Sequence, residues 1–441
     1  MKWQKNILHK MGKKIARILV FILLIWIHSA FATSEKADSS LTWAKCVEIA
    51  FKNNTDFLLA QNELKNVEGR ILKLKAPFRP RVGARAVSMP MIITIQATQV
   101  FYSASTVPTM KAAQIANKAA YINAEQAAVE LAFKLRIAFD RVLYLQKQIP
   151  LYEKYDNALQ LYLKRSKGLF DGGMLTKASL QSLEVREIFA RENLQQTQLQ
   201  FKAALLELAN VLGIDPSDPN FSQQVEGEFD RSTYSTNKIE DWIAFAFEQR
   251  RDLKALHEFK LINEQLVIVL RGALIPTVSF FQTFSTRFES PSELKKIQKI
   301  FSESEQHSST QEQIGLLTSW RVFDGNKTKG QMVEQKALSR RQDIFIKQLE
   351  NSIPGQITAL YSILEELERT LYHLEKSAIS QKNIEQAIIS FETGKASSLE
   401  LVNAQQEDLR YELNKLQILY QMDLIHAGFD KAIGNLVSSV P

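Results

Sequence analysis

The sequence contains an internal duplication, and this feature limits the possible folds more than any other. A shift of 196 residues aligns, without a gap, Ala50-Phe51 with Ala246-Phe247, Asp56 with Asp252, Glu68 with Glu264, Pro80 with Pro276 and Val82 with Val278. After Val100-Phe101, which matches Val322-Phe323, a shift of 221 aligns Gly173 with Gly394, Leu180 with Leu401 and Gly213 with Gly434. Because the matches keep their order, we interpret the chain as two copies of one structural unit.

The duplication defines the domain organisation. We expect a first structural repeat over 33–213, an equatorial linker over 214–238, a second repeat over 239–434 and a C-terminal tail over 435–441. Between the matched proline and the matched Val-Phe pair, the second copy is 26 residues longer. The extra residues are mostly polar, which predicts one long solvated loop over 287–313.

Each copy follows the same order of expected elements. A first helix, over 43–75 or 241–273, begins near an aspartate and ends before a proline. Two strands follow, and a long helical hairpin completes the copy. The expected strands are 82–87 and 92–101 within the strand pair 81–103, and 278–284 and 314–323 within the strand pair 277–323. The alternation of apolar and polar residues over 314–323 fits a strand of a membrane barrel and equally a half-buried strand of a soluble sheet.

The residues after the strands contain few helix breakers. In the second copy the apolar residues recur at alternating spacings of three and four, which is the seam of a coiled coil; they are Ile357, Leu360, Leu364, Leu367, Leu371, Leu374 and Ala378. A helix over 328–391 would extend roughly 95 Å at 1.5 Å per residue, too long for a compact domain. Pro150 and Pro354 are expected to kink the outgoing helices.

The N-terminal 32 residues carry the excess positive charge of the chain. The whole sequence has a net charge of +7, and removal of this segment, which holds six basic residues and no acid, leaves about +1. Ten apolar residues over 18–27 would span roughly 15 Å as a helix, about half of a bilayer core. We therefore expect a secretory signal over 1–32, cleaved after Ala32, with an uncleaved anchor as the alternative. The near-neutral remainder gives no basic face for nucleic acid.

Few residues suit catalysis or cofactor binding. The single cysteine, Cys46, excludes an internal disulfide and a cysteine-based zinc cluster. The histidines lack metal-ligand spacing, and we find no nucleophile motif or glycine-rich phosphate loop. We expect neither enzyme activity nor a cofactor or metal site.

Together, the export signal, the duplication, the strand pairs and the long hairpins resemble the TolC-like outer-membrane efflux proteins, the outer-membrane factors of tripartite export systems. The resemblance covers about residues 41–434. It is carried by Ala50-Phe51 with Asp56, Ala246-Phe247 with Asp252, the segment Trp320-Arg321-Val322-Phe323-Asp324-Gly325, and Gly394 with Leu401-Val402-Asn403-Ala404-Gln405. The chain departs from the family at Thr55, Arg251, Gln99 and Arg321, where members usually have proline.

The resemblance implies a mainly α-helical fold with a membrane β-barrel portion. Three copies would share one β-barrel in the outer membrane and one long α-helical, coiled-coil barrel in the periplasm. A four-stranded sheet has open edges that cannot face lipid, and symmetric closure removes them. The implied partners are two further copies of the chain, outer-membrane lipid, a periplasmic adaptor (membrane fusion) protein and an inner-membrane transporter.

The resemblance also assigns roles to the hairpin tips. Adaptor docking falls on Gly173, Met174, Leu175 and Thr176 in the first copy, and on Gly394, Lys395, Ala396 and Ser397 in the second. The glycines suit a tight helix reversal, and turn residues without a docking role would look the same.

In the family, an acidic ring and interhelical hydrogen bonds close the periplasmic aperture. Matched from Gly394, the ring positions are Glu400 and Asn403, and the latch positions include Phe391 and Ser179. Because these latch side chains differ from those of the family, we expect a single ring of three Glu400 carboxylates and a differently held closed state. Glu400 as an ordinary solvated residue is the alternative.

We therefore expect a passive duct that exports small molecules or polypeptides from the periplasm, or from an inner-membrane pump, to the exterior of a Gram-negative cell. The alternative is a soluble periplasmic coiled-coil scaffold or adaptor protein. Cell fractionation separates the two hypotheses, because only the duct would remain in the outer membrane.

Overall fold

The computed structural model describes residues 41–76, 79–88, 91–217, 221, 224–229, 238–288, 309–376, 386, 389–390 and 398–435. The expected signal over 1–32, residues 289–308 of the expected loop, parts of the linker, the second hairpin tip and residues 436–441 lie outside this described part.

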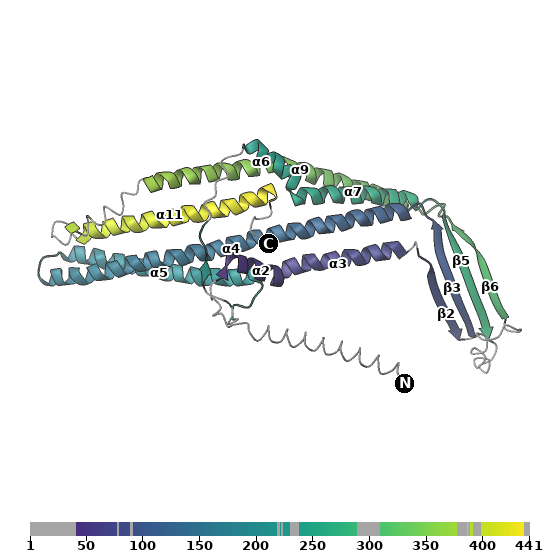
Figure 1. The fold of residues 1–441 in the computed structure, drawn as a ribbon, viewed down its shortest axis with the longest axis horizontal. Helices are drawn as coiled ribbons and strands as arrows, with labels where there is room; N and C mark the ends of the chain where they lie inside the picture. Colours follow the sequence, from purple (N-terminus) through teal and green to yellow (C-terminus); the bar gives the residue numbers. More distant parts are fainter. Residues whose placement is uncertain are drawn as a thin grey trace, which may run out of the picture.

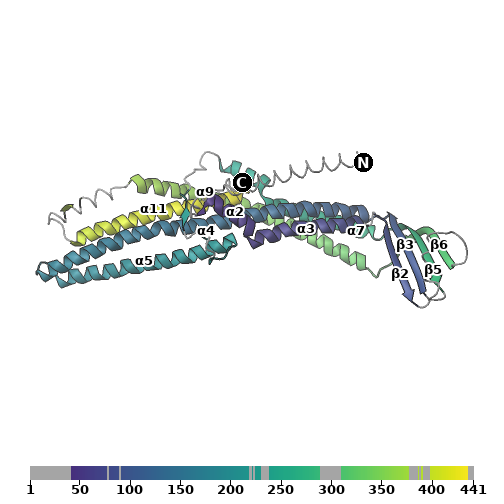
Figure 2. The same cartoon turned by 60° about the horizontal axis from the view of Figure 1, so that its bottom comes forward.

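The described helices form a long, narrow bundle that ends in a small β-sheet (Figure 1). A second view shows the same elongated outline (Figure 2). Helix α4 (Thr106–Asp171) starts beside the sheet and runs to the opposite end of the molecule, where the chain reverses into α5 (Lys177–Leu212). With 66 residues, α4 extends about 100 Å at 1.5 Å per residue.

The two copies have the same order of elements. The first copy contains α2 (Trp43–Asn53), α3 (Thr55–Lys75), β2 (Arg81–Ser88), β3 (Met91–Tyr102), α4 and α5. The second contains α6 (Ile239–Gln249), α7 (Arg251–Gly272), β5 (Thr277–Phe288), β6 (Ser309–Ser319), α9 (Lys327–Lys376) and α11 (Ser398–Ile433).

Each copy begins with two helices, so the single helix expected over 43–75 and over 241–273 is wrong. Asn54 takes an extended backbone conformation with φ −63° and ψ 123°, and Arg250 takes φ −60° and ψ 120°. The Asn54 side chain then caps α3 by accepting a hydrogen bond from the Phe57 amide at 3.1 Å. The cause of both breaks is tertiary, because Gly213 packs against the backbone of the first break and Gly434 against the second.

The four strands form one antiparallel sheet in the order β2-β3-β5-β6, so the two copies meet at the β3–β5 pair. Strand β6 begins five residues before the expected Ile314 and ends at Ser319. Residues 320–323, which we expected to continue the strand, lie beyond it. The indole Nε1 of Trp320 donates to the carbonyl of Leu274 at 3.1 Å, in the loop between α7 and β5.

The apolar core lies in the middle of the bundle, where the two copies pack together. One cluster combines α2, α4 and α5 with α11 and includes Val47, Leu135, Val142, Leu208, Leu416 and Leu419. A second cluster includes Ile353 and Ile357 of α9 and Phe429 and Ile433 of α11. The predicted seam of α9 is buried or half-buried at each position from Ile357 to Leu374. Helices α4 and α9 continue through Pro150 and Pro354.

A short parallel pair fixes part of the expected linker against the middle of α4. Strand β1 (Leu41–Thr42) pairs with β4 (Val225–Glu226). The side-chain amide of Gln146 accepts from the Val225 amide and donates to its carbonyl, both at 3.0 Å. Among the residues that the structure describes, no helix is long and apolar enough to cross a membrane.

Candidate functional site

Local hydrogen bonds build the tip of the first hairpin. Gly173 has a φ of 72°, its amide donates to the Phe170 carbonyl at 2.9 Å, and the Met174 amide donates to the Leu169 carbonyl at 2.8 Å. This pair of bonds is a Schellman motif, which ends a helix and favours glycine at the residue with positive φ. The reversal is thus encoded within a few residues of the tip.

The first tip presents the exposed apolar side chain of Met174 above a capped helix. Met174 is 73% exposed, whereas Leu175 is half-buried. Thr176 is the N-cap of α5, and its Oγ1 accepts from the Ser179 amide at 3.3 Å. The hydroxyls of Thr176 and Ser179 also lie 2.9 Å apart. Ser179, which we expected at the aperture, therefore contributes to the cap of its own helix.

The corresponding residues of the second hairpin tip lie outside the described residues. These are Phe391, Gly394, Lys395, Ala396 and Ser397. The described chain resumes with α11, whose first turn contains Glu400.

A polar contact joins the two hairpins roughly 15 Å along α5 from Thr176, at 1.5 Å per residue. Arg186 Nη1 donates to Asn403 Oδ1 at 2.9 Å and to Gln406 Oε1 at 3.0 Å. Asn403 and Gln406 are three residues apart and lie on the same side of α11. One guanidinium of α5 thus holds a full turn of α11. We call Arg186, Asn403 and Gln406 the clasp.

Apolar packing and two further polar contacts support the clasp. Leu183 of α5 and Leu401 and Val402 of α11 are almost completely buried beside it. Gln405 Nε2 donates to the Tyr162 hydroxyl at 2.8 Å, and Lys154 Nζ lies 3.2 Å from Asp408 Oδ2. Helix α11 is therefore held against both α4 and α5 in this region.

Glu400 is exposed and lies three residues before Asn403, so the two expected aperture residues share one side of α11. The first turn of a helix favours a carboxylate, because the helix dipole is positive there. Asn403 accepts a hydrogen bond from Arg186 of the same chain.

A buried charge cluster lies farther from the tip, between α4 and α11. Arg136 Nε donates to Asp140 Oδ2 at 2.8 Å, and its Nη2 donates to Asp423 Oδ1 at 2.6 Å. The guanidinium also lies 5.1 Å from the centre of the Trp43 ring. Burial raises the pKa of Asp140 to about 8 against the opposing charge of Arg136, and Asp423 adds to the rise. One arginine faces two carboxylates, so uptake of one proton makes the cluster neutral.

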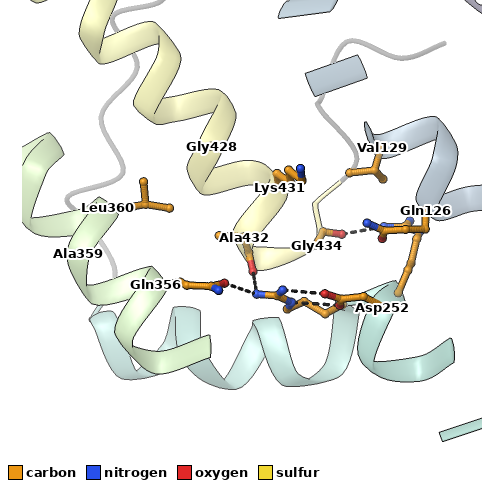
Figure 3. Close-up of a pocket in the computed structure, with 12 residues that line it drawn as sticks. Gln126, Val129, Asp252, Gln356, Ala359, Leu360, Gly428, Lys431, Ala432 and Gly434 are labelled. Carbon is orange, nitrogen blue, oxygen red and sulfur yellow. Dashed lines mark hydrogen bonds and ion pairs between the residues drawn. The ribbon is translucent and has the colours of Figure 1, made fainter. Parts of the chain in front are cut away.

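A cleft of about 500 Å³ lies where the second copy breaks between α6 and α7 (Figure 3). The Arg250 guanidinium donates hydrogen bonds there to the Asp252 carboxylate at 2.7 Å, to Gln356 Oε1 at 2.9 Å and to the Ala432 carbonyl at 3.3 Å. Arg251 donates to the Gly434 carbonyl at 2.9 Å. Because protein groups already use both guanidinium groups, we interpret this cleft as a structural joint.

The first copy has the same joint with different chemistry. Asn54 Nδ2 donates to the Val211 carbonyl at 2.9 Å, as Arg250 donates to the Ala432 carbonyl. The two contacts are equivalent in the sequence repeat: the shift of 196 residues relates Asn54 to Arg250, and the shift of 221 relates Val211 to Ala432. The repeated motif therefore marks a helix break that holds the end of the returning hairpin.

The described residues offer no obvious centre for metal or thiol chemistry. No group of three or more histidine, cysteine or acidic side chains among them could hold a metal ion. Cys46 is buried, and burial raises the pKa of its thiol to about 12. The thiolate that would react with electrophiles or bind metal is therefore disfavoured.

Sequence reasoning missed Arg186 and the buried cluster. Arg186 meets Asn403 across 217 residues of chain, and Arg136 meets Asp423 across 287. A charged residue on a long amphipathic helix is usually solvated, so no local pattern of residues indicates either contact. The matched pattern from Gly394 located Asn403 but not its partner.

Comparison with known proteins finds likeness in structure only. No family model matches the chain, and no curated protein sequence matches it. The Campylobacter jejuni outer-membrane channel CmeC has 14% identity and a TM-score of 0.75, covering 89% of this chain and 85% of its own. The Vibrio cholerae outer-membrane protein VceC has 14% identity and a TM-score of 0.73, and the match covers 89% of this chain and 96% of VceC.

The open state of the Neisseria gonorrhoeae outer-membrane channel MtrE also matches, with 14% identity, a TM-score of 0.72 and 89% of each chain covered. The match extends over nearly the whole described chain in all three cases. The fold is therefore that of outer-membrane channels of this type, as the resemblance to TolC-like proteins led us to expect.

Proposed function

We propose that this chain, which has the fold of outer-membrane channels, forms an export duct through the outer membrane as a homotrimer. The observation that carries the proposal is the likeness to outer-membrane channels, which covers 89% of this chain in each of the three cases. The duct would be passive and would depend on a periplasmic adaptor and an inner-membrane transporter for energy and cargo.

The sheet supports assembly into a closed structure. Strands β2 and β6 are the two edges of the four-stranded sheet, and each edge leaves backbone groups unpaired. Large apolar side chains on β6 are exposed, among them Ile314 and Leu316. Pairing of β6 with β2 of the next copy would satisfy the edges, and three copies would give one β-barrel in lipid.

The tip geometry supports adaptor docking at the end opposite the sheet. The exposed Met174 stands on a glycine turn fixed by its own hydrogen bonds, which lets another helical hairpin approach closely. Gly173, Leu175 and Thr176 would shape this surface, with Gly394, Lys395, Ala396 and Ser397 as the counterpart in the second copy.

The clasp supports a closed periplasmic aperture held within each protomer. Arg186 binds α11 to α5 through Asn403, where the residues expected to latch the hairpin, Phe391 and Ser179, have different chemistry. Glu400, on the same side of α11, would form a ring of three carboxylates around the axis. Release of α11 from the clasp would widen the aperture.

Fractionation and bilayer recording test the duct. We expect the full chain in outer-membrane fractions as a heat-sensitive trimer that gives single-channel currents in planar bilayers. Recovery in the soluble periplasm, without conductance, would support the scaffold or adaptor alternative and contradict the duct.

Neutralisation of the acidic ring tests the aperture. Glu400→Gln is expected to weaken cation selectivity and block by divalent cations, because three carboxylates would be lost from one constriction. Glu407→Gln, on the same helix, is the matched control. Unchanged selectivity in Glu400→Gln channels would show that Glu400 is an ordinary surface residue.

A further inference from the structure

Basic residues gather where the helices meet the sheet. The ten residues that adjoin each strand on its helical side are 71–80, 103–112, 267–276 and 320–329. Together they contain eight basic residues and one acidic residue, Asp324. The basic residues are Lys73, Lys75, Arg79, Lys111, Arg271, Arg321, Lys327 and Lys329. Without its first 32 residues the chain is almost neutral, so this excess is a local feature.

The sequence that joins the strands at their other ends shows no such excess. Residues 89–90 carry no charge, and residues 289–308 contain three lysines and four glutamates. The two ends of the strands therefore differ in charge, and only the helical end is strongly positive.

Three cations converge in a groove between α7 and α9, close to this junction. Arg271, Lys336 and Arg340 line a cleft of about 390 Å³ together with Ser339. Within the described chain none of the three cations has a hydrogen bond or an ion pair. Three unpaired positive charges that share one cleft form a favourable site for a phosphate group.

One acidic residue, Glu264, also lines the groove, and its charge acts on a fourth cation, Lys260. Asp343, through a hydrogen bond, and Glu264, through its charge, raise the pKa of Lys260. The charge of Glu264 is thus shared with Lys260, and the groove keeps its positive character.

Apolar and aromatic side chains adjoin the cations. Val267 and the 43% exposed Ile268 line the same groove. At the helical ends of β3 and β6, Tyr102, Trp320 and Phe323 are 54%, 59% and 79% exposed. Exposed aromatic residues followed by basic residues are typical of the boundary between hydrocarbon and lipid headgroups.

We propose that the junction binds the phosphate groups of anionic phospholipids in the periplasmic leaflet, with Arg271, Lys336 and Arg340 as its central site. The inference rests on the proposed function, which places the sheet in the outer membrane. Arg271 is six residues before the first residue of β5, which would place its side chain in the headgroup layer directly below the strands. The apolar residues of the groove favour a lipid over free phosphate, because they can contact the start of an acyl chain.

The test measures lipid binding by the full chain, purified as a trimer in neutral detergent. Fluorescent phosphatidylglycerol and phosphatidylcholine are titrated against the wild type and against Arg271→Gln/Lys336→Gln/Arg340→Gln. The control is Lys164→Gln/Arg165→Gln/Lys177→Gln, which removes three exposed cations near the first tip.

We expect the wild type and the control to prefer phosphatidylglycerol, with a preference that weakens as salt rises. Each basic residue near an anionic surface strengthens binding about fivefold. Loss of these three basic residues is therefore expected to weaken phosphatidylglycerol binding by on the order of a hundredfold. Phosphatidylcholine binding should stay unchanged.

Three results would overturn the inference: no preference for phosphatidylglycerol in the wild type, equal loss in the control, or competition by inorganic phosphate at the same concentration as the lipid. A changed reversal potential with unchanged lipid binding would overturn it as well, because the cations would then line the conduit. Bilayer conductance of the same wild-type preparation separates the two proposals. Conductance without lipid preference removes only this inference, whereas absent conductance removes the duct itself.

Discussion

Burial strongly changes the chemistry of Asp140. It is completely buried beside Arg136, which also binds Asp423. The attraction of one guanidinium cannot compensate two carboxylates in an apolar core, because removing a charge from water is costly. Burial therefore dominates, and Asp140 keeps a proton at a pH where a solvated aspartate has lost it.

This raised pKa makes stability depend on pH. The pKa of Asp140 rises from 3.8 to about 8 on folding, so between these values the folded state binds a proton that the unfolded state lacks. Stability should then fall as pH rises from about 4 to 8, by at most about 1.4 kcal/mol per pH unit. We expect Asp140→Asn, which imitates the protonated form, to flatten this part of the curve of melting temperature against pH.

Asp215→Asn is the control, because Asp215 is exposed and lies outside the cluster. A wild-type melting temperature that rises between pH 6 and pH 8 would contradict the assignment, as would an identical slope in Asp140→Asn.

At the scale of elements, the two joints show how the repeats hold their hairpins. A Cβ atom at Gly213 would lie 2.6 Å from the Asn53 carbonyl oxygen, and one at Gly434 would lie 2.9 Å from the Arg250 amide nitrogen. Both glycines also have positive φ, of 70° and 77°. Only glycine allows the returning helix to approach the break so closely.

Alanine at either joint should therefore destabilise the protein. We expect Gly213→Ala and Gly434→Ala each to cost about 2–3 kcal/mol, since backbone strain and a close contact add together. Gly69→Ala, in the middle of α3 with open space at the Cβ position, should be neutral or stabilising by about 0.5–1 kcal/mol. Chemical denaturation of the purified variants measures all three, and equal effects at positions 69 and 213 would contradict the joint.

The clasp is expected to control conductance more than stability. Its hydrogen bonds are exposed, so Arg186→Ala should reduce stability by about 1 kcal/mol or less. If the clasp holds the aperture closed, the same variant should conduct more current than the wild type in planar bilayers. Arg186→Lys, which lacks the planar fork, should give an intermediate current.

Lys202→Ala, an exposed position on the same helix, is the control for the clasp. An unchanged current in Arg186→Ala, or the same increase in Lys202→Ala, would show that the clasp does not close the aperture.

At the scale of the whole molecule, the core makes the two copies interdependent. Leu416 and Leu419 of the second copy complete a cluster formed by α2, α4 and α5 of the first. The sequence repeat divides the chain into two copies, but the two copies share one apolar core.

The first repeat alone should therefore fail to fold. We expect residues 33–213 to aggregate or to bind hydrophobic dyes without a cooperative thermal transition, because their apolar surface lacks α11. Co-expression with residues 214–441 should restore soluble, protease-resistant material. Cooperative unfolding of the isolated repeat would contradict this interdependence.

The sequence by itself determined the features that depend on near neighbours along the chain. The repeat, the long seam from Ile357 to Leu374, the turn at Gly173 and the strand pairs all follow from local periodicity or backbone preference, which short segments encode. Tertiary structure decided the helix breaks at Asn54 and Arg250, the departure of Trp320 from β6, the clasp of Arg186 with Asn403 and the protonation of Asp140. Each of these depends on groups tens to hundreds of residues apart, whose contact energies arise only after the helices have packed together.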